Sequence, residues 1–333
     1  MKIYFDWRLS RVLDDNGHIV DEIEWDGTMS PSGVAKRLMM IQKSRNLPEV
    51  TILSKRFPEA EIDYLGALSD PDWPVWKDSN ELFQRATLTL AKMGVADSSG
   101  DMDRRLDMLV SATLELRSSW TTSEARCVEW AGLFITEADL DSQRDEIPLV
   151  IASSESISEA SERLGVNSPM HLPSDSEWSS MVSHASAVIS SSKILEQLED
   201  SIREIAVRYV PSLSALLGPI SAAKLISLAG GRERLARMPS GSLQVLGAHA
   251  AMSAHRRGAP PPKHGAVLFS MPQVSRSPRW VRGKIARYLA GKASIAVRVD
   301  HFDGETWGKS QIDEINGEIE AIKAKFPKPP KRR

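Results

Sequence analysis

The chain has 333 residues, a mass of 36.8 kDa, 41% hydrophobic residues and a formal charge of −2 at pH 7. This length and apolar content allow two or three domains with cores of their own and exclude a disordered polymer. No run of about 18 apolar residues occurs, which excludes a membrane-spanning helix and a membrane partner. The single cysteine, Cys127, excludes an internal disulfide, and the polar start at residues 1–7 is unlike a signal peptide, so we expect a cytoplasmic protein.

The first hundred residues predict a small mixed α/β domain, residues 1–100. Segments 2–7 and 18–25 flank Asp15-Asn16-Gly17, a turn sequence that favours a β-hairpin. A short apolar run at 49–53 predicts a further strand. The acidic residues around the expected hairpin are typical of a solvated edge rather than of an acid/base pair.

Residues 101–210 predict a long antiparallel coiled-coil hairpin. Apolar residues recur at alternating spacings of four and three in segments 102–134 and 181–209. The connector, 141–175, contains three prolines and many serines, so we expect a turn with a short helix near 156–164. The seam could also join a second copy of the hairpin, and the alternative is a hairpin that does not dimerise. The seam residues are Leu106, Leu109, Leu116, Trp120, Trp130, Val188, Leu195, Leu198 and Ile202.

Residues 211–326 predict an all-helical domain, followed by a basic tail at 327–333. Glycines and prolines separate short helices at 213–217, 220–229, 233–237 and 243–257, and two longer ones cover 280–299 and 306–326. The fold class expected for the whole chain is therefore mostly α, with a small N-terminal α/β domain, a long coiled-coil hairpin and a helical C-terminal domain.

Charge divides the chain into two unlike halves. Residues 1–200 contain 19 Lys and Arg against 35 Asp and Glu, whereas residues 201–333 contain 23 against 9. From residue 234 to residue 299 there are twelve basic residues and no acidic one. Because unopposed positive charges repel one another, this segment predicts a polyanionic partner, with nucleic acid first. The alternative is a surface that is basic only for solubility.

No catalytic or metal-binding constellation is evident in the sequence. His249 and His255 are six residues apart, on different faces of a helix, which disfavours a metal site. Cys127 falls on the apolar seam, where it would be a small buried side chain, and Gly230-Gly231 lacks the spacing of a nucleotide loop. These features favour a scaffold that is not an enzyme. The alternatives are a stand-alone RNA-modifying enzyme with a catalytic N-terminal domain, and a general RNA chaperone.

Six C-terminal blocks of sequence are long and distinctive: residues 217–231, 236–240, 244–248, 262–265, 276–292 and 295–300. They resemble the Nop domain, most closely that of the archaeal Nop proteins of box C/D guide-RNA complexes. A stretch at 129–137 also resembles the end of the first coiled-coil helix of that family, whereas the first hundred residues resemble it only in architecture.

The resemblance implies a division of labour between this chain and its partners. The N-terminal domain would dock the methyltransferase fibrillarin, the coiled coil would form a homodimer, and the C-terminal domain would grip a kink-turn RNA together with its ribosomal-protein-like binder. Methylation of the ribose 2′-hydroxyl would belong to fibrillarin and its S-adenosylmethionine, so this chain would hold no cofactor and would supply position rather than chemistry.

The resemblance also implies where the RNA is held. Arginine forks suit paired phosphate oxygens, and lysine acts as a point charge. Trp280 would either stack on a base or anchor its helix. The basic residues expected at the RNA are Arg276, Arg279, Arg282, Lys284, Arg287 and Lys292, with Lys263 and His264 from the preceding loop.

The chain departs from the family at its Gly-Ala-Glu-Lys signature. Gly247 and Ala248 match, but His249 and Ala250 replace the acid and the base. In the family this signature lies on the helix against the RNA stem, so one contact would be lost here. We expect Arg256 and Arg257, two turns further along, to compensate electrostatically.

Overall fold

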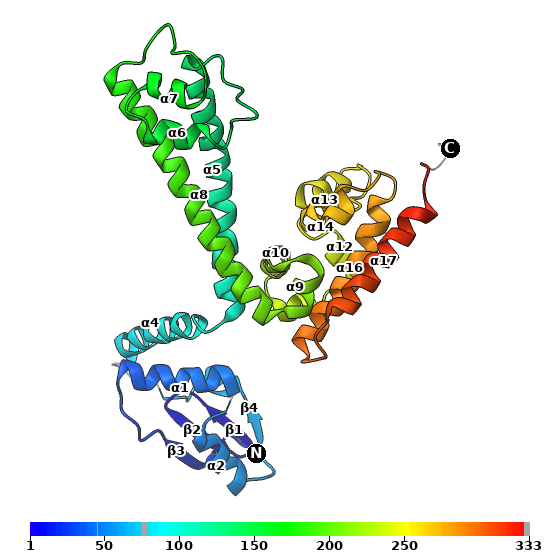
Figure 1. The fold of residues 1–333 in the computed structure, drawn as a ribbon. Coiled ribbons are helices and arrows are strands. Elements are labelled where there is room, and N and C mark those ends of the chain that lie inside the picture. Colours follow the sequence, from blue (N-terminus) through cyan, green and yellow to red (C-terminus); the bar gives the residue numbers. More distant parts are fainter. Residues whose placement is uncertain (45, 75–78, 330–333) are drawn as a thin grey trace. The chain divides into compact units, whose positions relative to one another are not determined.

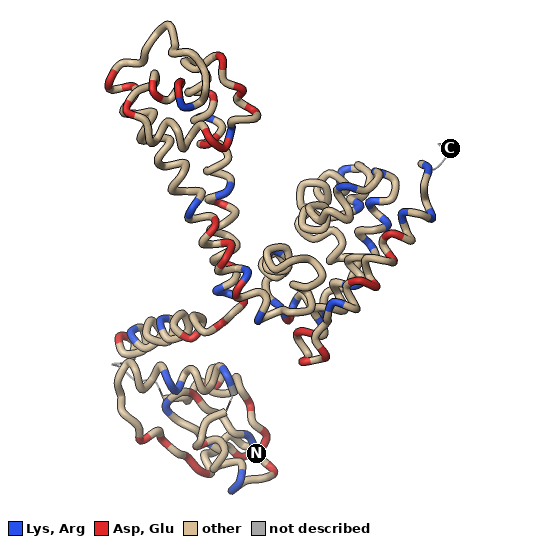
Figure 2. Tube along the Cα trace, in the orientation of Figure 1, with Lys and Arg blue, Asp and Glu red and all other residues tan. Residues whose placement is uncertain are grey.

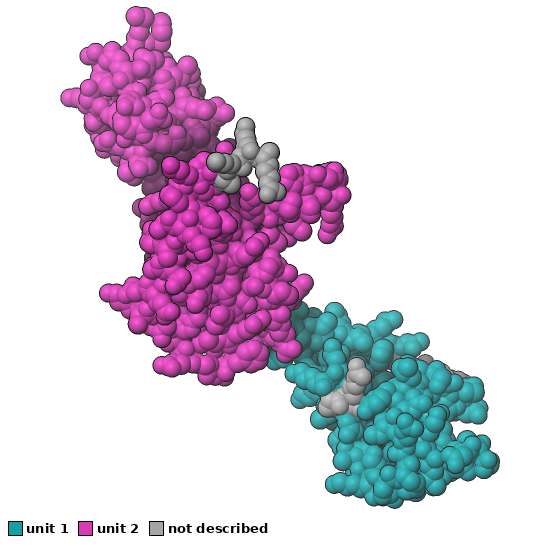
Figure 3. All heavy atoms as spheres, turned by 90° about the vertical axis from the view of Figure 1, so that its right-hand side faces the viewer, with its two compact units in different colours: residues 1–101 teal, residues 102–333 magenta. Residues whose placement is uncertain are grey.

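A computed structural model describes residues 1–44, 46–74 and 79–329 (Figure 1). The chain divides into two compact units, residues 1–101 and 102–333, which are coloured separately in Figure 3. The fold class expected from the sequence is confirmed, because a small sheet occurs in the first unit and the second unit is helical.

The first unit contains a four-stranded sheet in the order β3-β2-β1-β4. Its strands are β1 (Lys2–Phe5), β2 (Leu9–Leu13), β3 (Ile19–Glu24) and β4 (Glu61–Asp63). Strand β2 runs antiparallel to both β1 and β3, and β4 pairs in parallel with β1. The hairpin predicted between 2–7 and 18–25 is wrong in its first strand. The Asp6 carboxylate accepts the N–H groups of Arg8 and Leu9 and turns the chain after β1, so β2 becomes the partner of β3.

Four helices complete this unit: α1 (Pro31–Ser44), α2 (Pro48–Arg56), α3 (Gly66–Ser69) and α4 (Ser79–Ser98). The strand predicted at 49–53 is wrong, because these residues belong to α2. Pro48 occupies the first helical turn after the extended Leu47, which favours a helix start. Val50 and Leu53 then share one helical face and are buried against Ile3.

The hairpin in the second unit consists of α5 (Met102–Phe134) and α8 (Asp175–Tyr209). The helices run antiparallel, because Arg117 pairs with Glu199 at one level and Ser123 lies 3.1 Å from the His184 ring at another. At the tip, α6 (Ile147–Ser153) and α7 (Ile157–Arg163) form a small core with both long helices. Helix α7 confirms the short helix predicted near 156–164, and Ser156 caps it by accepting the Glu159 N–H. Helix α6 was not predicted.

The predicted seam lies largely inside this hairpin. Leu106, Val188, Leu195 and Ile202 are fully buried within the chain. Half-buried seam residues are Leu109, Leu116, Trp120, Trp130 and Leu198. Since the strongest apolar positions are already covered by the same chain, a face for a second copy would have to use other residues.

The C-terminal half is built from α9 (Pro211–Leu217), α10 (Pro219–Ala229), α11 (Arg232–Arg237), α12 (Ser240–Gln244), α13 (His249–Arg256), α14 (Ala266–Ser270), α15 (Pro272–Ser275), α16 (Arg282–His301) and α17 (Lys309–Lys325). Gly230 ends α10 in the left-handed conformation, as expected. The single helix predicted over 243–257 is wrong. It is broken between α12 and α13, where Gly247 has φ +81°.

The base of the hairpin and these helices share one continuous core, which includes Leu106 and Ile202. Two carboxylates stabilise this core by accepting backbone N–H groups at helix starts. Asp300 on α16 accepts the N–H groups of Ser212 and Leu213 at 2.9 Å each, at the start of α9. Asp103 on α5 accepts the N–H of Arg232 at 3.0 Å, at the start of α11. A negative charge at a helix start also interacts favourably with the helix dipole.

Asp300→Asn should lower the free energy of unfolding by about 2 kcal/mol, because two charge-assisted hydrogen bonds of a buried carboxylate become neutral. Urea denaturation at pH 7, followed by circular dichroism, measures the change. Asp313→Asn, at an exposed position of α17, serves as the control and should leave the midpoint unchanged. Equal midpoints for the two variants would contradict this role of Asp300.

Candidate nucleic-acid interface

The twelve basic residues of 234–299 lie in the C-terminal half, many of them on and between α13 and α16 (Figure 2). The residues expected at the RNA that are exposed are Arg256, Arg257, Lys263, Arg276, Arg279, Lys284 and Arg287, and those that are half-buried are His264, Arg282 and Lys292. Within the described ranges none of them forms an ion pair with a carboxylate; the basic residue of this segment that does is Arg237, with Glu233. Their charge is therefore available to an anionic ligand.

The loop before α14 is fixed in place by Gln244. The Gln244 side-chain amide donates to the Lys263 carbonyl at 2.6 Å, and the Gln244 carbonyl accepts the Gly265 N–H at 2.7 Å. A Cβ on Gly265 would collide with the Leu246 carbonyl, and one on Gly283 would lie 3.2 Å from the Lys263 side chain. The two glycines thus allow the loop to approach the end of α12 and the first turn of α16, which places Lys263 beside that turn.

The Phe269 ring contacts two of the residues expected at the RNA, His264 and Arg282. The His264 ring stacks on Phe269 with centroids 4.7 Å apart and an interplanar angle of 11°. The Arg282 guanidinium lies 5.6 Å from the Phe269 centroid and donates to the Ser277 carbonyl at 2.8 Å. Arg282 is therefore held in position before any ligand arrives, which reduces the entropy lost on binding.

The N-terminus of α16 adds partial positive charge to this surface. The helix has 20 residues, no acidic residue in its first turn and no side-chain cap from Val281. Its free N–H groups and its dipole favour a negative group nearby. The expected residues Arg279 and Arg282 lie at this helix start, and Lys284 and Arg287 follow within two turns.

Trp280 is half-buried and packs against the core, with its Nε1 donating to the Phe326 carbonyl at 2.8 Å. Lys284 extends over the Phe326 ring at 4.1 Å. The structure thus favours the anchoring interpretation of Trp280, because the indole fastens the end of α17 to α16. Lys292 lies 5.5 Å from the Tyr288 ring on the same helix.

The signature positions lie around the start of α13. Gly247 is in the break before the helix, Ala248 is its N-cap residue, and His249 and Ala250 are exposed in its first turn. The φ of Gly247 favours glycine, and a Cβ there would lie 3.1 Å from the Leu228 side chain, which would have to shift slightly.

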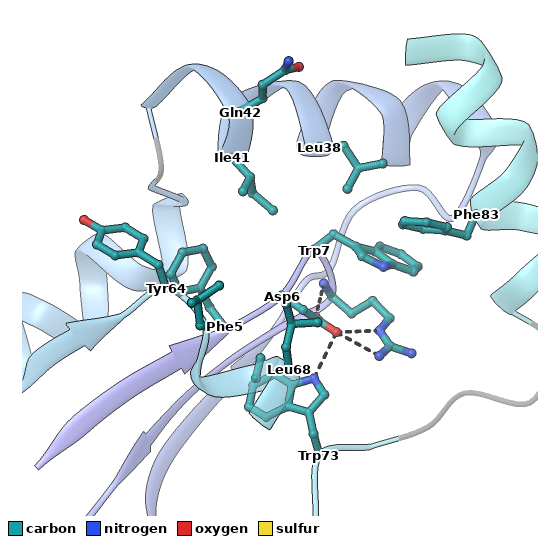
Figure 4. A pocket seen from close by; sticks show the side chains of 13 residues that line it. Phe5, Asp6, Trp7, Leu38, Ile41, Gln42, Tyr64, Leu68, Trp73 and Phe83 are labelled. Atoms are coloured by element: carbon teal, nitrogen blue, oxygen red, sulfur yellow. Dashed lines mark hydrogen bonds and ion pairs between the residues drawn. The ribbon is translucent and has the colours of Figure 1, made fainter. Parts of the chain in front are cut away.

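A second candidate site, a groove of about 950 Å³, lies within the first unit (Figure 4). Trp7 stacks against Phe83 at one side, and Leu38 and Ile41 of α1 face the interior. Its rim includes Leu65 and Leu68, which are 67% and 85% exposed. We call this the N-terminal groove.

Polar contacts stiffen the N-terminal groove. The Asp6 carboxylate pairs with Arg8 at 2.8 Å and accepts the Trp73 indole N–H at 3.0 Å. Arg8 also donates to the Pro74 carbonyl at 3.1 Å. Because the two charges neutralise each other, the groove presents mainly apolar and aromatic surface. Sequence reasoning missed it, although the aromatic residues of the first eighty positions are a signal for such a surface.

Cys127 and clusters of possible metal ligands are the other places in the described chain where chemistry could occur. Burial, with a smaller contribution from Glu124, raises the pKa of Cys127 to about 11, so the thiol stays protonated at neutral pH. No group of three or more His, Cys, Asp or Glu side chains is arranged to hold a metal ion in the described ranges. Nor is any single described helix long and apolar enough to cross a membrane; α9 and α10 reach that threshold only as a pair bent by 115°.

Comparison with protein families identifies most of the helical second unit. Residues 125–321, more than half of the chain, match the family described as Nop, snoRNA binding domain, fibrillarin. The chain belongs to the Nop family. The resemblance noted in the sequence is thereby confirmed, and the basic surface of α13–α16 belongs to the Nop domain.

Individual relatives match over shorter stretches. A NOP5 family protein of Methanocaldococcus jannaschii is 42% identical over 135 residues, 40% of this chain and 32% of its own length. Nucleolar protein 56 of Caenorhabditis elegans is 34% identical over 151 residues, 44% of this chain and 31% of its own. Human nucleolar protein 56 is 38% identical over 121 residues, which are 36% of this chain and 20% of the human protein. The matched part is thus about a third or less of each curated relative.

One solved structure is similar along most of its length. A chain in the crystal structure of a fibrillarin/Nop5p complex is 21% identical in sequence to this chain, with a TM-score of 0.42. The alignment covers 99% of that chain and 96% of this one.

Proposed function

We propose that this chain is a non-catalytic scaffold of a box C/D guide ribonucleoprotein. Its Nop domain binds a kink-turn RNA together with the kink-turn protein, and its first unit docks fibrillarin. Fibrillarin, with S-adenosylmethionine, then methylates ribose 2′-hydroxyls of ribosomal RNA or tRNA in the cytoplasm. The observation that carries the proposal is the set of basic residues on α13–α16, which lie within a domain that matches the snoRNA-binding family. None of these basic residues forms an ion pair with a carboxylate in the described chain.

The arrangement of charge suits an RNA backbone better than a base sequence. A-form RNA is recognised mainly through its shape and its phosphates. Arg279, Arg282 and Arg287 supply guanidinium forks, and the start of α16 supplies N–H groups. Such contacts confer salt-dependent affinity with little sequence preference, so specificity comes from the kink-turn protein bound beside them.

The N-terminal groove supports docking of the methyltransferase. It is apolar, its cations and anions are paired with one another, and Leu65 and Leu68 stand exposed at its rim. Exposed apolar surface of this kind marks protein interfaces. A homodimer, the remaining part of the proposal, would use surfaces of the hairpin other than the buried seam.

Binding of a kink-turn RNA to the full chain tests the proposal. The chain should bind the RNA much more tightly when the kink-turn protein is already present, and the affinity should fall steeply between about 0.1 and 0.5 M salt. Affinity that neither depends on salt nor increases with the kink-turn protein would refute the scaffold. Turnover with S-adenosylmethionine and RNA alone would instead establish the enzyme alternative.

The changed signature offers a further prediction. Arg256→Ala combined with Arg257→Ala should weaken assembly on the RNA by about tenfold, whereas Ala250→Lys should change it by less than about threefold, because the two exposed arginines replace the missing lysine. Electrophoretic mobility shifts with the kink-turn protein present measure both effects. The reverse order of the two effects would contradict the compensation.

A further inference from the structure

A smaller apolar groove lies on the hairpin, outside both the basic surface of the Nop domain and the N-terminal groove. Its volume is about 390 Å³, and it is formed where α6 packs beside α5 and α8. Trp120, Pro148, Leu149, Val188 and Ile189 supply its apolar lining. Leu149 is 53% exposed, so the groove is open to another molecule. We call it the hairpin groove.

One polar atom of its lining has no partner. The Trp120 Nε1–H is enclosed and donates to no acceptor among the described residues, while the Arg117 guanidinium lies over the indole ring at 5.7 Å. Enclosed polar groups are normally satisfied by protein, water or another molecule. An occupant that brings an oxygen to this indole after a small adjustment of the ring would remove that cost.

The surroundings of the hairpin groove are acidic. The head of the hairpin, defined as residues 135–174, contains eight Asp and Glu against two Arg. Arg144 pairs with Glu124 of α5 at 2.6 Å, and Arg163 donates to the Ser153 carbonyl. In the described chain no head carboxylate forms an ion pair. The groove itself is lined by the paired Arg144 and Glu124, by Asp145 of the head, and by Glu196 and Lys193 of α8, the last three of them exposed.

We propose that the hairpin groove docks a basic amphipathic segment of a protein partner. An apolar side chain of that segment fills the space between Trp120, Leu149 and Ile189, while its Lys or Arg residues face Asp145, Glu196 and the head. Charge decides the class of partner. RNA phosphates would be repelled by the unpaired carboxylates of the head. This partner goes beyond the proposed function, which assigns no ligand to this groove.

A synthetic helical peptide tests the proposal. The probe is a fluorescein-labelled 15-residue peptide with leucines on one face and lysines elsewhere, and binding to the full chain is followed by fluorescence anisotropy at about 150 mM salt. Leu149→Lys and, separately, Ile189→Lys should weaken binding at least tenfold. Leu114→Lys, at an exposed position of α5 outside the groove, is the matched control and should leave binding unchanged. A peptide with serine in place of leucine should bind at least tenfold more weakly.

Three results would overturn the proposal. Equal binding by the Leu149→Lys and Leu114→Lys variants, or by the leucine and serine peptides, would show that charge alone attracts the probe. The second is self-association: if the wild-type chain is a dimer in sedimentation velocity and Leu149→Lys makes it a monomer, the groove belongs to a second copy. The third is RNA binding: if Leu149→Asp weakens binding of a labelled single-stranded RNA, measured without the peptide, and Leu114→Asp does not, the groove belongs to RNA.

Discussion

Replacing Arg279, Arg282 and Arg287 together by glutamate should weaken binding of the kink-turn complex by at least about 100-fold. In the proposed complex each arginine would make a charge-assisted contact to phosphate, and each glutamate would add repulsion at the start of α16. The slope of log affinity against log salt concentration should become shallower by about two to three, since fewer counterions are released. Isothermal titration at several salt concentrations measures both quantities.

A variant with an equal change of net charge elsewhere serves as the control. Lys36→Glu, Lys55→Glu and Lys92→Glu alter three exposed lysines of the first unit. This triple variant should bind the kink-turn complex within about twofold of wild type, because only charges near the phosphates contribute strongly at physiological salt. Equal losses in the two triple variants would mean that overall charge, not the α13–α16 surface, holds the RNA.

Changing Leu65 and Leu68 to aspartate should abolish docking of fibrillarin while leaving RNA binding intact. Both side chains are largely exposed, so the free chain loses little stability. Burial of each leucine against a partner would contribute about 1.5–3 kcal/mol, so losing both should weaken docking by at least about 100-fold. Co-sedimentation or titration of the chain with fibrillarin measures the loss.

Leu88→Asp is the matched control for the N-terminal groove. Leu88 is 59% exposed on α4 and does not line the groove. This variant should bind fibrillarin as well as the wild type does. If Leu88→Asp abolishes docking and the Leu65 and Leu68 changes do not, the methyltransferase uses another face of the first unit.

The helices of the Nop domain were predictable because their ends are encoded locally. Gly218-Pro219 and Gly230-Gly231 place the ends of α9 and α10, since the positive φ of these glycines suits few other residues. The apolar spacing of residues 280–299 likewise predicts α16. The prediction of a strand at 49–53 failed because a short apolar segment suits a strand and a helix equally. Pro48 and the core around Ile3 favour the helix here.

The two grooves were not predictable, since each is assembled by tertiary packing. The N-terminal groove brings Phe5 of β1, Leu38 of α1 and Phe83 of α4 together, and no local pattern links them.

The partner of the coiled-coil seam was not predictable either. Its spacing predicts that two helices pair, but Leu195 and Ile202 could cover a helix of the same chain or of a second copy equally well, and burial within one chain is a property of the fold.

Reconstitution tests the central claim most directly. The full chain is combined with a box C/D guide RNA, the kink-turn protein and fibrillarin, and site-directed 2′-O-methylation is scored with each component omitted in turn. The account predicts that methylation requires this chain and is lost with the glutamate variant of Arg279, Arg282 and Arg287. Methylation that persists without the chain, or that the chain performs with RNA and S-adenosylmethionine alone, would contradict it.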